Sequence, residues 1–562
     1  MIRAHHGWRH VFVTAALTAA AALLVAATTR AEADYELWLA RLLFWSMPAV
    51  LAFVATGMAA AWRERHESLR ACAAQVLPGL LYSAAITALL FALLPPELRI
   101  QFDETSILGA SKSMHEHHAC VVTTGALPVE GEVFARENTT DKRPPLFAFL
   151  VHLLHRVTGF RIENGFWVNG ILLTVGMTAT FRFVAARAGR LCAFLAPACI
   201  ATVPAIAASA TSAGFDLMAS AWLAIALFAA ITFLERPTNG HFCWLLAALM
   251  LLAQSRYESL LASGGIAAFV FVAVRKRYRP NRTGTAMLAC TPALLLPVIL
   301  LLYHSRNPKF YPEADGASLV GLSHVVDHLG PLLGALFSPS PTSPFPAWLS
   351  MAGAIALALR IRKSGMQAAD WLVAGTVLGS TGIALAWFYG DVREPNAVRL
   401  FLPLAWSTAL LPLLVFRWLG RRASTVLAAL IVAGCGIRIA GMARGTSVSP
   451  SHITALTNEL DALTALLPGE PGTTLWVGTP AQHLILHGHA ALTPAGFDRR
   501  RADLQVLANR GDLQHVYILR TAIDDEMRAA VGNMQTVFGG LAVERITPQR
   551  TEASVEVFRM KR

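Results

Sequence analysis

Two short charged motifs stand near the ends of one polar stretch, residues 95–145, in an otherwise apolar region of the sequence. The first motif is the carboxylate pair Asp103-Glu104, and the second is Lys142-Arg143, which two prolines follow. A positioned carboxylate can accept a proton from a reacting hydroxyl, and lysine and arginine side chains bind phosphate oxygens. Because long loops with structure of their own are usually functional, the two motifs predict a site that handles a charged headgroup at a membrane surface.

The composition of the chain indicates the surroundings of this stretch. Of the 562 residues, 55% are hydrophobic, and the mean hydropathy is +0.50. These values are typical of a polytopic membrane protein and too apolar for a soluble protein of this length. The net charge of +12 does not indicate nucleic-acid binding, because the basic residues gather in short connections between apolar runs and not on a soluble module among aromatic residues.

About thirteen apolar runs predict transmembrane helices. If the chain crosses the membrane at each run, five basic clusters fall on one side, which identifies that side as the cytoplasm. The expected location is the inner (plasma) membrane of the cell. The N-terminus is then cytoplasmic, and the C-terminal domain lies on the extracytoplasmic side. The sequence Ala31-Glu32-Ala33 leaves a second interpretation open, in which the first run is a removed signal peptide. The expected spans are 11–28, 35–62, 76–94, 165–186, 191–208, 217–234, 242–255, 259–274, 286–303, 346–360, 370–389, 398–416 and 423–443.

Two segments of the extracytoplasmic loop 95–160 predict helices at the membrane interface. Residues 146–160 are apolar but too short to span, with His152, His155 and Arg156 near one face. Residues 104–118 are the second such segment. We therefore expect structured elements around the charged motifs.

The composition changes after about residue 445. The pattern predicts one amphipathic helix at 453–467 and strands at 473–478, 483–486, 516–519 and 555–558. The expected organisation is thus a transmembrane domain, 1–445, followed by a small extracytoplasmic α/β domain, 446–562. A turn at 469–472 lacks a phosphate-loop pattern, so no catalysis is assigned to the second domain. Its expected role is support, with acceptor docking and partner contact left open.

Further charged residues lie in connections that face the same compartment as the Asp103 loop. They are Asp216 after the fifth span, Arg256 and Glu258 before the eighth, and Arg399 in the last outer turn. A loop at 304–345 is expected on this side as well. Carboxylates and guanidinium groups are therefore predicted to converge at one membrane face.

The acidic pair followed by Lys142-Arg143-Pro144-Pro145 resembles a motif set of the GT-C glycosyltransferases. The likeness is strongest to the branch with protein O-mannosyltransferase-like enzymes and the aminoarabinose transferases of lipid A. Asp216 matches a second acidic position of that family, and Arg399-Leu400-Phe401-Leu402-Pro403 is similar to its late Arg-Tyr-x-x-Pro segment, with Phe in place of Tyr. Arg143 is an insertion into the family's Lys-Pro-Pro, and three spans precede the loop where many relatives have one.

The resemblance implies an α-helical GT-C fold and an inverting transfer of a sugar from a polyprenyl-phosphate donor. A lipid-linked donor suits the outer face, which has no supply of nucleotide sugars. The acceptor is then a hydroxyl of a glycolipid, a polysaccharide or a protein. Asp103 is the candidate base, and Glu104 or Asp216 is expected to orient the acceptor or a cation. The candidate ligands of the donor phosphate are Lys142, Arg143, Arg256 and Arg399.

Simpler roles remain open for each of these residues. Asp103 and Asp216 each stand where a helix begins and can serve as caps, and Arg256 can pair with Glu258. No cofactor is certain, although a divalent cation held by Asp103 and Asp216 is an option. A zinc site at His115 and His118 is weaker, because a tetrahedral site needs more ligands.

Two other functions compete with sugar transfer. A transporter or flippase of a lipid-linked glycan would carry ionisable residues inside its spans, and here only Arg438 clearly does so. A membrane scaffold whose outer domain does the work is the other alternative.

Overall fold

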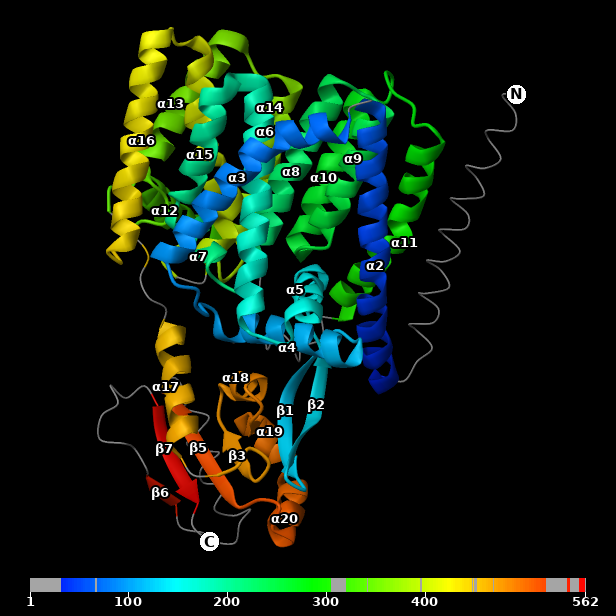
Figure 1. Ribbon diagram of the computed structural model, residues 1–562, viewed down its shortest axis with the longest axis vertical. Helices are drawn as coiled ribbons and strands as arrows, with labels where there is room; N and C mark the ends of the chain where they lie inside the picture. The colour runs from blue at the N-terminus through cyan, green and yellow to red at the C-terminus, as the bar shows by residue number, and fades with distance from the viewer. Residues whose placement is uncertain are drawn as a thin grey trace. The chain divides into compact units, whose positions relative to one another are not determined.

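The computed structural model divides the protein into two compact units (Figure 1). The membrane unit comprises the described residues of Met1–Pro96 and Lys142–Ser449, and the sheet unit those of Glu97–Asp141 and Pro450–Arg562. Residues 97–141 therefore belong to the same compact unit as the C-terminal segment. The domain boundary at 445 stays a prediction. The described residues are 32–65, 68–304, 320–340, 342–394, 397–446, 448, 452–467, 469–521, 543–545 and 555–560.

The membrane unit is a bundle of helices, as its apolar runs predict. Within the described residues, nine helices are long and apolar enough to cross a membrane. The expected run at 11–28 lies outside the described residues, and helical segments cover each of the other twelve. The run 191–208 is divided between α6 and α7, and the run 398–416 among η1, α15 and η2. The helices at 242–255 and 346–360 are not among the nine. The helices are α2 (Glu32–Arg65), α3 (Leu69–Leu93), α5 (Leu146–Thr158), α6 (Glu163–Ala201), α7 (Pro204–Ala210), α8 (Asp216–Glu235), α9 (Asn239–Ala253), α10 (Tyr257–Val274), α11 (Arg282–His304), α12 (Leu322–Phe337), α13 (Ala347–Ser364), α14 (Ala368–Ala386), η1 (Val398–Phe401), α15 (Leu402–Leu410), η2 (Leu411–Trp418) and α16 (Arg421–Ala443).

Helix α6 joins two expected spans across a break in its backbone. Gly189 has φ 85° and ψ 172°, which is not helical. Glycine tolerates a positive φ because it has no Cβ atom. The break falls among Arg182, Arg187 and Arg190, where the sequence predicts a short basic connection.

The expected loop 304–345 is not irregular throughout, because residues Leu322–Phe337 form helix α12. Its leucines recur at helical spacing, and Leu332 and Leu336 are buried. His324, Asp327 and His328 interrupt its apolar run, and its 16 residues are fewer than a membrane span needs. The prediction of a long loop was wrong for this part.

The sheet unit contains a seven-stranded mixed sheet in the order β2-β1-β4-β3-β5-β7-β6. Alternate side chains of its central strands point to opposite faces, as expected for β structure. Leu475 and Ile518 pack with Phe497 and Leu504 on one face. On the other face, Trp476 and Tyr517 pack with residues of helices α17 and α18. The elements are α4 (Gln101–His117), β1 (Val121–Val129), β2 (Glu132–Thr140), α17 (His452–Leu466), β3 (Thr474–Val477), α18 (Ala481–Leu486), β4 (Ala490–Leu492), α19 (Pro494–Arg499), α20 (Arg501–Arg510), β5 (His515–Thr521), β6 (Val543–Arg545) and β7 (Val555–Met560).

The hairpin of β1 and β2 was not foreseen. Its two-residue turn, Glu130-Gly131, has φ values of 51° and 83°, the pattern of a tight hairpin turn. Strand β1 also pairs with β4 at Gly125 and Leu492. A Cβ atom at Gly125 would come within 2.8 Å of the Leu492 side chain, so glycine permits this close approach.

One expected strand is a helix. The prediction for 483–486 was wrong, because these residues belong to α18. Short apolar runs do not distinguish strand from helix. The buried residues Ala481 and Leu484, three positions apart, follow the helical period. The helix at 453–467 and the strands near 473, 516 and 555 are confirmed.

The structure therefore confirms a helical polytopic membrane protein with a small α/β portion.

Candidate functional site

Asp216 lies at the centre of a buried ionic cluster in the membrane unit. It begins α8, and its side chain is only 4% exposed. Arg256 donates to Oδ1 of Asp216, and Nη1 of Arg399 lies 3.3 Å from Oδ2. The two guanidinium groups are also largely buried, at 15% and 16% exposure. Segments distant in sequence thus meet on one carboxylate.

A fourth charge completes this cluster. Nε of Arg256 lies 3.2 Å from Oε2 of Glu258, in the first turn of α10. The formal charges of Asp216, Glu258, Arg256 and Arg399 cancel, which makes the burial of the first carboxylate and the two guanidinium groups tolerable, whereas Glu258 is 39% exposed. Pairing of Arg256 with Glu258, the simpler interpretation of the sequence, is therefore present, and Arg256 bonds to Asp216 as well.

The turn before Asp216 is held by a residue that sequence reasoning missed. Nδ2 of Asn169, buried in α6, donates to the carbonyl oxygens of Ser212 and Gly214, each at 2.7 Å. A buried amide that satisfies two carbonyls fixes the path of the turn. The available signal was an asparagine in the middle of an apolar run.

Aromatic packing adds to the placement of Arg256. Its guanidinium carbon lies 5.2 Å from the centre of the Phe215 ring, within the range of cation–π attraction. Phe215 directly precedes Asp216. The same short segment therefore supplies both the carboxylate and an aromatic face to Arg256.

Asp103 and Glu104 belong to the sheet unit, in the first turn of α4. Glu104 is fully buried, and its Oε2 accepts from the backbone N–H groups of Arg99 at 2.6 Å and Ile100 at 3.2 Å. This carboxylate therefore caps the start of the helix. Asp103, one residue earlier, is half-buried.

Arg99 adds a charged group to the same helix start. Its Nη1 lies 2.7 Å from Oε1 of Glu97. Burial lowers the pKa of the Arg99 guanidinium, and the Glu97 and Glu104 carboxylates oppose this shift. Guanidinium groups stay protonated in proteins, so Glu97 and Glu104 both face a permanent cation.

Lys142 and Arg143 lie in the membrane unit, directly before α5. Arg143 is buried and Lys142 is half-buried. The expected helix at 146–160 is present as α5, and His152 and His155 lie on its buried side. The phosphate-binding role of Lys142 and Arg143 stays a prediction.

The structure bears on two metal hypotheses. Both oxygens of Asp216 already accept from guanidinium groups, and two adjacent cations oppose a divalent ion there. Helix α4 ends at His117, and His118 has a left-handed backbone with φ 53°. His115 and His118 therefore do not share one helical face, which is a further argument against a zinc site there.

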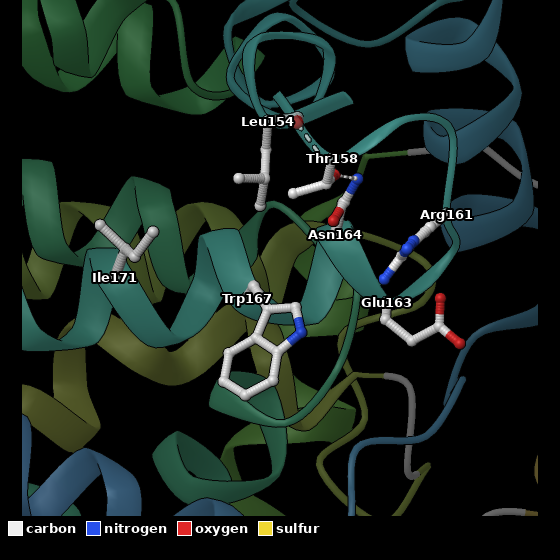
Figure 2. Close-up of a pocket in the computed structure, with 7 residues that line it drawn as sticks. All are labelled: Leu154, Thr158, Arg161, Glu163, Asn164, Trp167 and Ile171. Carbon is white, nitrogen blue, oxygen red and sulfur yellow. Dashed lines mark hydrogen bonds between the residues drawn. The ribbon is translucent and has the colours of Figure 1, made fainter. Parts of the chain in front are cut away.

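A pocket of about 660 Å³ opens where α5 meets α6 (Figure 2). Leu154, Trp167 and Ile171 form its apolar wall, and Arg161 and Glu163 stand at the same pocket as charged residues. Asn169 lies two residues after Trp167, about 200° further around the helix. The pocket is therefore on the opposite face of α6 from the turn that carries Asp216, and it suits an apolar chain better than the ionic chemistry.

Comparisons with known proteins show the fold. The chain resembles ArnT from Cupriavidus metallidurans, solved bound to undecaprenyl phosphate, with a TM-score of 0.57 and 11% identity over 85% of this chain and 97% of that one. It is also similar to the Archaeoglobus fulgidus oligosaccharyltransferase AglB (TM-score 0.47, 12% identity, 86% and 74% covered) and to the mycobacterial arabinofuranosyltransferase AftD (0.46, 13%, 85% and 41%). The latter two likenesses are too weak to bear on the fold. No family model matches the sequence, and no curated protein matches it.

The chain has a GT-C-like fold. The family resemblance read from the motifs is thereby confirmed at the level of the fold.

Proposed function

We propose that this protein is a glycosyltransferase that moves a sugar from a polyprenyl-phosphate donor to an acceptor hydroxyl, with inversion at the anomeric carbon. The observation that carries the proposal is the meeting of Arg256 and Arg399 on Asp216 within a GT-C-like fold. Buried guanidinium groups suit a phosphate that becomes more negative as the bond to the sugar breaks. ArnT, which shares the fold, was solved with undecaprenyl phosphate.

In the proposed reaction, the acceptor oxygen attacks the anomeric carbon from the side opposite the phosphate. The new carbon–oxygen bond forms as the bond to the phosphate oxygen breaks, and that oxygen keeps the electron pair. The hydroxyl proton passes to the carboxylate of Asp103. A positioned carboxylate contributes roughly 10²- to 10⁴-fold to such a step.

The remaining charged residues have supporting roles in this proposal. Arg256 and Arg399 stabilise the leaving phosphate, together with Lys142 and Arg143. Asp216 holds the two guanidinium groups in position between turnovers. Glu104 supports Asp103 by fixing the first turn of α4, where both residues lie.

The proposal also fixes a location. Since the basic connections mark the cytoplasmic side, the reaction takes place at the outer face of the plasma membrane, where a lipid-linked sugar is the accessible donor. The acceptor class is a glycolipid, an envelope polysaccharide or a protein. The apolar pocket of Leu154, Trp167 and Ile171 is a candidate groove for the prenyl chain (Figure 2).

The test is a transfer assay with the purified full-length protein and a panel of radiolabelled undecaprenyl-phosphate sugars. The assay measures release of undecaprenyl phosphate and appearance of the labelled product. We expect Asp103→Asn to lower the transfer rate at least about 100-fold, while Asp103→Glu keeps part of it. Equal unfolding temperatures would show that both variants fold. Undiminished transfer by Asp103→Asn would remove Asp103 as the base.

A flippase is the second candidate function, because Arg438 is buried within the long apolar helix α16. Ionisable residues inside spans often serve transport. Vesicles that contain the protein and a fluorescent polyprenyl-phosphate sugar, without any acceptor, distinguish the two functions. Translocation that Arg438→Gln abolishes and Asp103→Asn spares would favour transport.

A further inference from the structure

Two histidines and an aspartate meet at the surface of the sheet unit, and the proposed reaction uses none of the three. Nε2 of His483 lies 3.0 Å from Oδ1 of Asp461, and Nε2 of His487 lies 4.0 Å from the same oxygen. All three ligand atoms fall within 4.8 Å of one another. No other part of the described chain brings together three such groups.

The local fold explains this meeting. His483 and His487 are four residues apart, at the start and just past the end of α18, so they project from one side of the helix. Their rings lie 4.5 Å apart. Asp461 comes from α17, and Leu460 of α17 and Leu484 of α18 belong to the same apolar core. The apolar core therefore holds the carboxylate against the two imidazoles.

The three side chains differ in exposure, as expected for a metal site with one buried ligand and two ligands that solvent can reach. His483 is 3% exposed, whereas His487 and Asp461 are 35% and 47% exposed. The buried Nδ1 of His483 makes no hydrogen bond with any described residue. The Asp461 contact at Nε2 is thus what orients this ring, and an ion can enter from the exposed side.

We propose that Asp461, His483 and His487 bind Zn²⁺, with water as the fourth ligand. Neutral imidazole and carboxylate are common zinc ligands, and bonds of about 2.0–2.1 Å in a tetrahedron place ligand atoms about 3.3 Å apart. The separations of 3.0 and 4.0 Å from Oδ1 of Asp461 lie close to that value, and the two histidine ligand atoms lie within 4.8 Å of each other. Bound zinc would fasten α17 to α18.

The experiment measures Zn²⁺ binding to the purified full-length protein by competition with a chromogenic chelator. We expect one equivalent to bind at micromolar or lower concentration, and His487→Ala and Asp461→Asn each to weaken binding at least about 10-fold. His487 and Asp461 are exposed enough for these variants to fold, which the unfolding temperature without metal checks. His241→Gln, in the membrane unit, is the matched histidine control and should bind as the wild type does.

X-ray absorption at the zinc edge supplies the second measurement. Two imidazoles with oxygen ligands and no sulfur are expected, because Cys120 and the other described cysteines lie outside the cluster. Zinc should also raise the unfolding temperature of the wild type and not that of His487→Ala. No saturable binding, or unchanged binding by both cluster variants, would overturn the proposal, and a loss of sugar transfer would not bear on it.

Discussion

The first turns of α4 and α8 both carry acidic residues, yet the two carboxylates meet different partners. Glu104 in α4 accepts from the backbone of its own helix start. Asp216 in α8 accepts from Arg256 and Arg399, which lie 40 and 183 positions further along the chain. An acidic residue at a helix start therefore identifies the start, and only long-range packing decides whether the carboxylate caps the helix or anchors an ionic cluster.

The largest effect on folding is expected at α8. Asp216→Asn leaves two buried guanidinium groups without their shared anion, which should lower the free energy of unfolding by about 3–5 kcal/mol. Denaturant unfolding in detergent measures this value. Glu235→Gln, at the exposed end of the same helix, removes a pair with Arg187 and should cost below about 1 kcal/mol. Equal losses in the two variants would show that Asp216 is an ordinary surface charge.

The next largest effect is expected on donor binding, where the buried Arg399 is compared with the exposed Arg393. Arg399→Gln should raise the KM for the lipid donor about 10- to 100-fold, because a charge-assisted bond to phosphate is lost. Arg393, whose side chain is 71% exposed, pairs with Asp391 in a nearby turn. Arg393→Gln should leave the KM within about twofold. A steady-state titration of the donor compares them, and equal KM values would remove Arg399 from the phosphate site.

A smaller effect is expected at α4. Glu104→Gln keeps the shape of the side chain but loses its charge at the positive end of the helix, which should cost about 1–2 kcal/mol of unfolding free energy. Sugar transfer by the folded variant should fall less than in Asp103→Asn. Thermal unfolding and the transfer assay together check both parts. If transfer disappeared while stability held, Glu104 would be part of the reaction and not only a cap.

The smallest effect is a pH-dependent change in stability that the carboxylate of Glu137 is expected to cause. Glu137 of β2 lies 2.8 Å from Nη2 of Arg499 and 3.4 Å from Nε of Arg500. Burial raises the pKa of Glu137. The guanidinium groups of Arg499 and Arg500 lower it by a larger amount, so the net shift is downward. The stabilisation is therefore present above the ordinary glutamate value of about 4.3 and is lost as the pH falls below it.

The comparison of wild type with Glu137→Gln tests this sign. At pH 7 the variant should be less stable by up to about 1 kcal/mol, and the two unfolding curves should converge on acidification below about pH 4. A difference that stays constant or grows in acid would show that the ion pair does not stabilise the sheet unit.

Much of the membrane unit was predictable from hydropathy alone, since every expected span within the described residues is covered by one or more helical segments. Gly189 even lies in a basic connection where the sequence predicts a break. Helix α12 escaped because its apolar residues cover only one face. Its 16 residues are also too few for a membrane span, although its helical periodicity is clear.

The sheet unit was harder to predict, because its strands pair across distant segments. The β1–β2 hairpin lies in a polar stretch, and its only strong local signal is the Glu130-Gly131 turn. Its sheet neighbour, β4, comes from the other end of the chain, which no local pattern reveals. The same holds for Asn169, whose function depends on carbonyl groups 43 and 45 positions away.

The pairing of β1 with β4 has a consequence for biogenesis. Arg499 binds Glu137 although the two are 362 positions apart, so the hairpin leaves the ribosome long before the strand that covers its edge. An uncovered strand edge invites pairing with other chains, and contacts of such separation form slowly. Truncated chains that stop before α17 should therefore retain the membrane helices and yet be prone to aggregate through β1.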